Sequence, residues 1–200
     1  MSKQRLKSPR ARLFVALDLP ERLREGIVDW VREALADPAL RPVSPESLHV
    51  TLAFLGYLPE RAIEETAAVV AGLEATAPKI ELRDSVPRPT RGRPRLFALP
   101  VESAGIFELE AELRKKLVGA RLYKPEKRPF WPHLTVARVR REERGSSRPA
   151  EVAQPPGALP KDFIRTHVCV RATLYRSKLQ PQGAQYAPLA QVELSEDGRQ

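Results

Sequence analysis

The pattern His-x-Thr occurs twice in this chain and constrains the fold more than any other feature. One copy consists of His49 and Thr51, and the other of His133 and Thr135. Both copies lie in short apolar runs that favour β-strands. In a strand, residues i and i+2 point to the same side, so each copy places an imidazole beside a hydroxyl on one face. The chain has only three histidines, and we expect the fold to bring the two strands face to face.

The remaining sequence predicts helices that come between strands rather than after each one. We expect strands over residues 13–19, 48–55, 79–86, 95–100, 134–139, 163–175 and 185–194, and helices over residues 20–37, 59–75 and 105–118. We expect loops over residues 41–47, 87–94, 122–132 and 140–159, and a turn over residues 177–184. The strand–helix–strand order before residue 78 recurs over residues 95–140. This order predicts an α+β fold with a duplicated architecture and one His-x-Thr strand in each half.

The length and composition are those of a globular protein with a sizeable core, at 42% hydrophobic and 30% charged residues. We expect one domain over residues 12–194, a basic disordered tail over residues 1–11 and a polar tail over residues 195–200. No apolar run reaches the roughly 18 residues of a membrane helix, and the N-terminal region does not resemble a signal peptide. The single cysteine, Cys169, excludes an internal disulfide framework. We therefore expect a cytoplasmic protein.

The formal net charge of +9 favours an anionic partner, of which nucleic acid is the usual one. An arginine-rich composition can also simply reflect the genome, and charge alone does not separate the two explanations. The arginines of residues 87–95 are accordingly either RNA contacts or part of a solvated basic loop. The basic extension before Arg12 either helps to hold RNA or has no role.

Two imidazoles and two hydroxyls around one point suit the hydrolysis of a phosphodiester. A neutral imidazole can take a proton from the attacking water, while a protonated one gives a proton to the leaving oxygen. The two threonine hydroxyls can donate hydrogen bonds to the non-bridging phosphate oxygens. This chemistry needs no cofactor and no metal, and two histidines alone are too few ligands for a catalytic zinc.

A structural role for these residues is the alternative, because threonine is common in strands and histidine is tolerated there. The repetition of the pattern in a chain with three histidines favours the catalytic role. The third histidine, His167, lacks a threonine two residues later, and we predict that it is structural. Asp18 ends an apolar strand, and we predict that it caps a helix or forms a turn.

Four segments, in order, resemble the two-histidine phosphoesterase superfamily. Within it they resemble the RNA 2′,3′-cyclic phosphodiesterases of bacteria and archaea, also called LigT-like proteins or 2′–5′ RNA ligases. The segments are RLFVALDLP at residues 12–20, LHVTLAFLG at residues 48–56, RPFWPHLTVAR at residues 128–138, and LYRSKL at residues 174–179 with Gly183 and Tyr186. The resemblance covers nearly the whole chain, from about residue 12 to residue 194.

The resemblance implies a bilobal, pseudo-twofold LigT-like fold, with two antiparallel sheets facing a central cleft and helices on the outside. It implies hydrolysis of RNA 2′,3′-cyclic phosphate ends to 2′-phosphates, with tRNA fragments or small cyclic nucleotides as possible substrates. His49 would be the general acid and His133 the general base, while Thr51 and Thr135 would donate to the phosphate. Because the cleft forms within one chain, we expect a monomer.

Two further residues are expected at the site on weaker grounds. The family suggests that Arg138 contacts the phosphate, but strand alternation places it off the face shared by His133 and Thr135. It reaches the site only if the strand bulges. Tyr186 either stacks on a base of the RNA or belongs to the core.

Two other functions remain open from the sequence. One is an RNA-end-binding module without turnover, which the positive charge favours. The other is a 2′–5′ RNA ligase that runs the reverse of the same chemistry. The chain has no Gly-x-x-x-x-Gly-Lys loop, so the sequence does not indicate ATP-driven joining.

Overall fold

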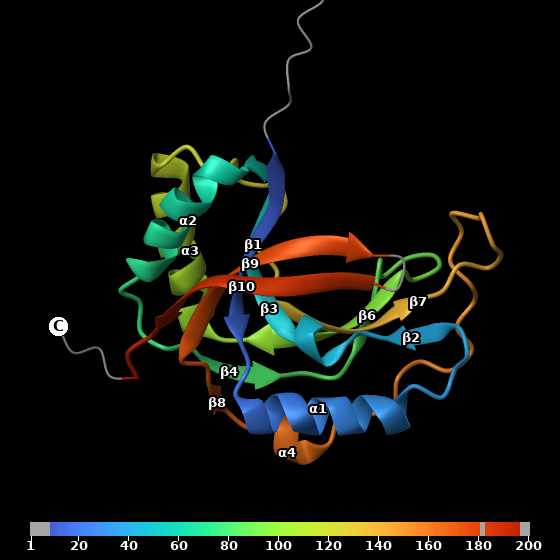
Figure 1. Cartoon of the computed structure of the whole chain (residues 1–200). Coiled ribbons are helices and arrows are strands. Elements are labelled where there is room, and N and C mark those ends of the chain that lie inside the picture. The colour runs from blue at the N-terminus through green and yellow to red at the C-terminus, as the bar shows by residue number, and fades with distance from the viewer. Residues whose placement is uncertain (1–8, 181–182, 197–200) are drawn as a thin grey trace, which may run out of the picture.

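A computed structural model describes residues 9–180 and 183–196, which form two antiparallel sheets with helices outside them (Figure 1). The first sheet has the order β10 (Gly183–Glu193), β9 (Arg171–Gln180), β1 (Arg10–Asp18) and β3 (His49–Pro59). The second has the order β2 (Leu40–Pro42), β7 (His133–Val139), β6 (Leu96–Glu102), β4 (Lys79–Leu82) and β8 (His167–Val168), and β5 (Val86–Arg88) also pairs with β6. The expected α+β class and the expected arrangement of two antiparallel sheets are therefore confirmed.

The apolar run that opens the chain forms the centre of the first sheet. β1 lies between β9 and β3, and it is covered on both faces. Leu13, Val15 and Leu17 are fully buried on one side, and Phe14 and Ala16 are buried on the other. A strand that is buried on both faces reads as a continuous apolar run rather than an alternating one, which is why the sequence showed it clearly.

The helices follow from apolar residues at helical spacing. They are α1 (Glu21–Ala34), α2 (Ile63–Ala71), α3 (Ala104–Gly119) and α4 (Lys161–Ile164). In Figure 1, α2 and α3 lie side by side at the first sheet, and α1 and α4 lie together below the second. A Cβ atom at Gly26 of α1 would lie 2.6 Å from ring carbons of Phe163 in α4, so the ring packs directly against the glycine.

Several local expectations were wrong, including the loop over residues 87–94, whose first two residues belong to β5. Residues 41–47 were expected to be a loop, but β2 begins at Leu40 and pairs with β7. Residues 163–175 contain part of α4, all of β8 and the start of β9, rather than one strand. The expected turn over residues 177–184 is also wrong, since β9 continues to Gln180 and β10 begins at Gly183. In β9 and β10, pairing of the backbones forms strands from polar residues that composition alone assigns to a turn.

The predicted tails lie mostly outside the described residues. β1 begins at Arg10, two residues before the expected start of the domain. At the other end, Ser195 forms a bridge with Thr76, and its carbonyl oxygen accepts a hydrogen bond of 2.8 Å from the amide of Ala77. Among the described parts of the chain, none of the helices has the length and apolar character needed to cross a membrane.

Candidate active site

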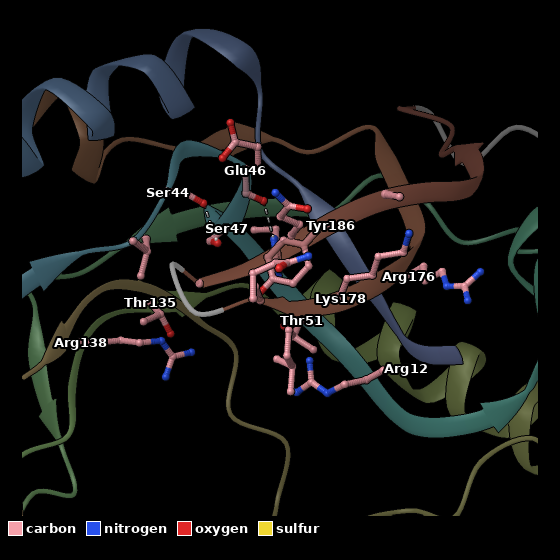
Figure 2. Close-up of a pocket in the computed structure, with 18 of the residues that line it drawn as sticks. Arg12, Ser44, Glu46, Ser47, Thr51, Thr135, Arg138, Arg176, Lys178 and Tyr186 are labelled. Carbon is pink, nitrogen blue, oxygen red and sulfur yellow. Dashed lines mark hydrogen bonds between the residues drawn. The ribbon is translucent and has the colours of Figure 1, made fainter. Parts of the chain in front are cut away.

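The two His-x-Thr strands, β3 and β7, are where the two sheets approach each other. A cavity of about 1220 Å³ lies between them, which we call the central cavity. His49 and Thr51 line it from β3, and Thr135 and Arg138 line it from β7. Figure 2 shows Thr135 and Arg138 on one side of this cavity, with Thr51 and Arg12 on the other. Tyr186 of β10 completes the set of expected residues at this cavity.

His133 lines a second cavity of about 810 Å³, which shares Thr51 with the central cavity. Many of its other lining residues are aromatic, and we call it the aromatic cavity. These aromatic residues are Phe54, Phe107, Tyr123, Phe130 and Trp131. His49 and His133 thus line two neighbouring cavities that share Thr51.

A β-bulge in β7 turns Arg138 toward the central cavity. Thr135 pairs with Ala98 of β6 and Ala137 pairs with Phe97, so Val136 has no partner on that strand. Val136 and Ala137 are therefore both buried, and the alternation resumes one residue later with Arg138 exposed. Arg138 was expected to reach the site only if the strand bulges, and β7 has such a bulge.

The same bulge occurs at the same place in β3. Thr51 pairs with Ala16 of β1 and Ala53 pairs with Val15, which leaves Leu52 unpaired on that strand. Phe54 then takes the position that Arg138 has in β7. The guanidinium of Arg12 lies 4.5 Å from the centre of the Phe54 ring. Arg12 and Thr51 therefore line the central cavity from the first sheet, as Arg138 and Thr135 line it from the second. Arg12 was not among the site residues expected from the sequence.

Backbone carbonyl groups fix the orientation of both imidazoles. Nδ1 of His49 donates to the carbonyl oxygen of Glu46 at 3.3 Å, and Nδ1 of His133 donates to that of Trp131 at 2.8 Å. A carbonyl oxygen can only accept, so the proton is on Nδ1 in both neutral rings. In each histidine, Nε2 remains as the nitrogen for proton transfer.

Aromatic rings surround His49. Its ring stacks on Phe14 with centroids 5.0 Å apart, lies 5.9 Å from Tyr175, and meets the ring of Tyr186 at 5.4 Å in an edge-on geometry. Tyr186 thus lies beside the histidine at the central cavity rather than in the core. Burial lowers the pKa of His49, whereas the bond to Glu46 and the nearby carboxylate of Asp18 act to raise it.

His133 has a different neighbourhood. Its imidazole stacks on the indole of Trp131 with centroids 4.1 Å apart, and the guanidinium of Arg88 lies 3.8 Å from the centre of the same indole. Burial lowers the pKa of His133, the bond to the Trp131 carbonyl opposes this, and the positive charge of Arg88 lowers it further. A carboxylate therefore stands near one histidine and a guanidinium near the other.

Asp18 does not cap a helix, so that expectation was wrong. Its carboxylate accepts hydrogen bonds from three residues of β9: Arg171 Nε at 2.9 Å, Thr173 Oγ1 at 2.7 Å and the Tyr175 hydroxyl at 2.8 Å. The residue before α1 is Pro20, which makes no side-chain cap. Asp18 instead holds Tyr175 in place beside His49, an arrangement that depends on the pairing of β1 with β9.

The central cavity carries an excess of positive charge. Among the described residues, its basic side chains are Arg12, Arg41, Arg138, Arg176 and Lys178, and its carboxylate is that of Glu46. Arg176 forms an ion pair with Glu60. Such a surface concentrates anions. His167 lies in β8 and lines none of the cavities described here.

The arginines of residues 87–95 do not act as one group. Arg88 belongs to β5 and lies over Trp131 beside the site. Arg93 is bound in ion pairs with Glu142 at 2.8 Å and Glu151 at 3.6 Å. Arg91 and Arg95 are exposed. Of these four arginines, Arg88 is the one that lies close to a candidate catalytic residue, His133.

Comparison with known proteins places these features in a family. The sequence pattern of the 2′-5′ RNA ligase superfamily matches residues 19–172. The RNA 2′,3′-cyclic phosphodiesterase of Thermus thermophilus is 31% identical over 94% of this chain and 93% of its own length. That of Escherichia coli is 30% identical over 92% of this chain and 97% of its own length.

Solved structures agree with the sequence comparison. The crystal structure of TT0787 of Thermus thermophilus superimposes with a TM-score of 0.76 at 31% identity, covering 93% of this chain and 100% of that one. The crystal structure of Escherichia coli LigT complexed with 3′-AMP superimposes with a TM-score of 0.71 at 27% identity. The match covers 93% of this chain and 99% of that one. With both His-x-Thr strands at one groove and this likeness along its length, the chain belongs to the 2′-5′ RNA ligase superfamily.

Proposed function

We propose that this protein hydrolyses RNA 2′,3′-cyclic phosphate ends to 2′-phosphates. The observation that carries the proposal is the pair of histidines, each oriented through Nδ1 by a backbone carbonyl, on the two strands that border one basic groove. Relatives from Thermus thermophilus and Escherichia coli, at about 30% identity, bear the name of this activity.

The charges near the histidines support opposite roles for them. Burial has the largest effect on both histidines and lowers the pKa of each, but the carboxylate of Asp18 acts in the opposite direction on His49, which favours His49 as the general acid. Arg88 favours the neutral form of His133, which suits a general base. The two strands are related by the duplication, but the charged neighbours of the two imidazoles differ in sign.

The reaction then proceeds by in-line attack of water on phosphorus. Nε2 of neutral His133 takes a proton from the water as its oxygen bonds to phosphorus. The bond between phosphorus and the 3′ oxygen breaks, and that oxygen takes a proton from Nε2 of His49. The product carries a 2′-phosphate and a 3′-hydroxyl. The protein's own side chains serve each proton transfer, so we propose a metal-independent reaction.

The other residues stabilise the charge that builds on the phosphate. The hydroxyl groups of Thr51 and Thr135 donate to its non-bridging oxygens, and Arg138 offsets their negative charge. Tyr186, at the rim beside His49, provides a ring on which a terminal base can stack. Since the groove forms within one chain, a monomer contains every residue of this scheme.

The test is a single-turnover assay with a short RNA that ends in a 2′,3′-cyclic phosphate, run in the presence of EDTA. Chromatography and phosphatase sensitivity identify the product end. We expect a 2′-phosphate, and we expect His49→Ala and His133→Ala each to lower the rate roughly 10²–10⁴-fold. Salt-sensitive retention of the RNA without turnover would favour a binding module instead, and joined RNA products would favour a ligase.

A further inference from the structure

A third hollow, of about 710 Å³, adjoins the central cavity, and Arg41 and Arg138 line both. Six arginines line this hollow, which we call the arginine hollow: Arg41, Arg95, Arg138, Arg140, Arg141 and Arg144. Of the residues that the structure describes, Glu143 is the one carboxylate that lines it. All six arginines are exposed, so the positive charge of the site continues across the molecular surface.

The strand pairing forces these charges together. Arg41 of β2 and Arg138 of β7 are direct cross-strand partners, and like charges in that position repel each other. Backbone hydrogen bonds hold two more arginines at the same edge. The amide of Val139 donates to the carbonyl oxygen of Arg95 at 2.9 Å, and the amide of Arg140 donates to the carbonyl oxygen of Ala39 at 2.8 Å. An anion bound across the hollow offsets this repulsion.

The carboxylates nearby do not neutralise the hollow. Glu142 forms ion pairs with Arg93 at 2.8 Å and with Arg148 at 3.4 Å. Within residues 9–180 and 183–196, the lining arginines form no ion pair of 4.0 Å or less with a carboxylate; the ion pairs found there are made by other basic residues. The hollow thus retains its charge for an external partner.

The chemistry of the hollow selects phosphates rather than bases. Its described lining contains no aromatic side chain, in contrast to the aromatic cavity on the other side of Thr51. A basic groove without stacking platforms follows the backbone of a nucleic acid strand and ignores its sequence. Guanidinium groups suit such contacts because each can bind two phosphate oxygens at once.

We propose that the arginine hollow binds backbone phosphates of the RNA chain that precedes the cyclic end. The inference rests on the proposed function, because it assumes that the cyclic phosphate lies in the central cavity next to Arg138. It makes single-stranded RNA of several nucleotides a better substrate than a cyclic mononucleotide, which cannot reach the hollow. It also makes that preference independent of base sequence and sensitive to salt.

The test compares two double variants that remove the same amount of charge. R141Q/R144Q alters the hollow outside the central cavity, and R22Q/R61Q alters exposed arginines that line none of the three cavities. Each is assayed on a nucleoside 2′,3′-cyclic phosphate and on a single-stranded RNA of about ten nucleotides with a cyclic end, a length within the range of single-strand grooves.

We expect R141Q/R144Q to lower kcat/KM on the RNA roughly 10-fold and to keep wild-type kcat/KM on the mononucleotide. Its salt dependence on the RNA should be less steep by roughly 0.7 in log–log slope for each phosphate that the variant no longer neutralises. R22Q/R61Q should match the wild type on both substrates. Wild-type activity of R141Q/R144Q on the RNA, or an equal decrease on both substrates, would overturn the inference.

A binding measurement separates this inference from the proposed function. If the wild type hydrolyses neither substrate, the proposed function is wrong. The role of the arginine hollow can then still be tested by measuring the binding of the same RNA by fluorescence anisotropy. Weaker RNA binding by R141Q/R144Q than by R22Q/R61Q supports the phosphate contacts. Equal binding by the two variants contradicts them.

Discussion

Phe54 and Arg138 occupy equivalent positions, each the third residue after the threonine of its His-x-Thr strand and each turned to the groove by a β-bulge. The bulge leaves Leu52 unpaired against β1 in one strand and Val136 unpaired against β6 in the other. One half of the duplicated site therefore supplies its cation directly, through Arg138. The other supplies Arg12, whose guanidinium lies over the Phe54 ring.

This relationship predicts that Arg138 contributes directly to phosphate binding. Replacing Arg138 with alanine removes a charged donor from the central cavity, and we expect kcat/KM on a cyclic mononucleotide to fall roughly 10- to 100-fold, the worth of a hydrogen bond to a charged group. Arg22→Ala, which removes an exposed arginine of α1, serves as the control and should retain wild-type kcat/KM. Equal activity of the two variants would remove Arg138 from the site.

The threonine hydroxyls should act mainly in the transition state. Thr135→Val keeps the shape of the side chain but removes the donor, and we expect kcat to fall roughly 10²-fold with a smaller change in KM. Thr135→Ser restores a hydroxyl and should recover most of the activity. Steady-state kinetics on the cyclic mononucleotide would show this, and a serine variant as slow as the valine variant would point to a packing role instead.

Local spacing in the sequence predicted several of the residues that the structure brings to the two cavities. His49, Thr51, His133 and Thr135 were identifiable because strand alternation places each pair on one face and the pattern repeats. β1 was identifiable from its continuous apolar run. Trp131, two residues before His133, could have been recognised by the same spacing, because a residue that precedes a proline, here Pro132, favours an extended backbone.

Long-range pairing determines the rest of the site, and local sequence does not encode it. Asp18 looked like a helix cap because its partners in β9 are more than 150 residues away in sequence, at separations of 153 to 157. Arg88 reaches Trp131 only because β5 pairs with β6. The bulge that redirects Arg138 is a mismatch between two strands, and neither strand alone shows it.

The hydrogen bonds of Asp18 predict a structural role with a measurable free energy. Asp18→Ala leaves three donors of β9 without their acceptor, and we expect the free energy of unfolding to fall by about 2–3 kcal/mol. Urea denaturation measures the change. Asp29→Ala is the matched control, because its ion pair with Arg32 on α1 is exposed, and it should cost less than about 1 kcal/mol. Equal decreases would mean that the Asp18 network contributes no more than a surface ion pair.

Arg88 should set the acidic limb of the pH–rate profile. The base must be neutral to accept a proton, so kcat/KM falls on the acid side as His133 becomes protonated. The positive charge of Arg88 lowers the pKa of His133. Removing that charge in Arg88→Gln raises the pKa, and the acidic limb should move to higher pH. Arg88→Lys keeps the charge and should leave the limb close to its wild-type position. The measurement is kcat/KM on a cyclic mononucleotide across the pH range, and a shift of the alkaline limb alone would mean that His133 is the acid and that the two roles are reversed.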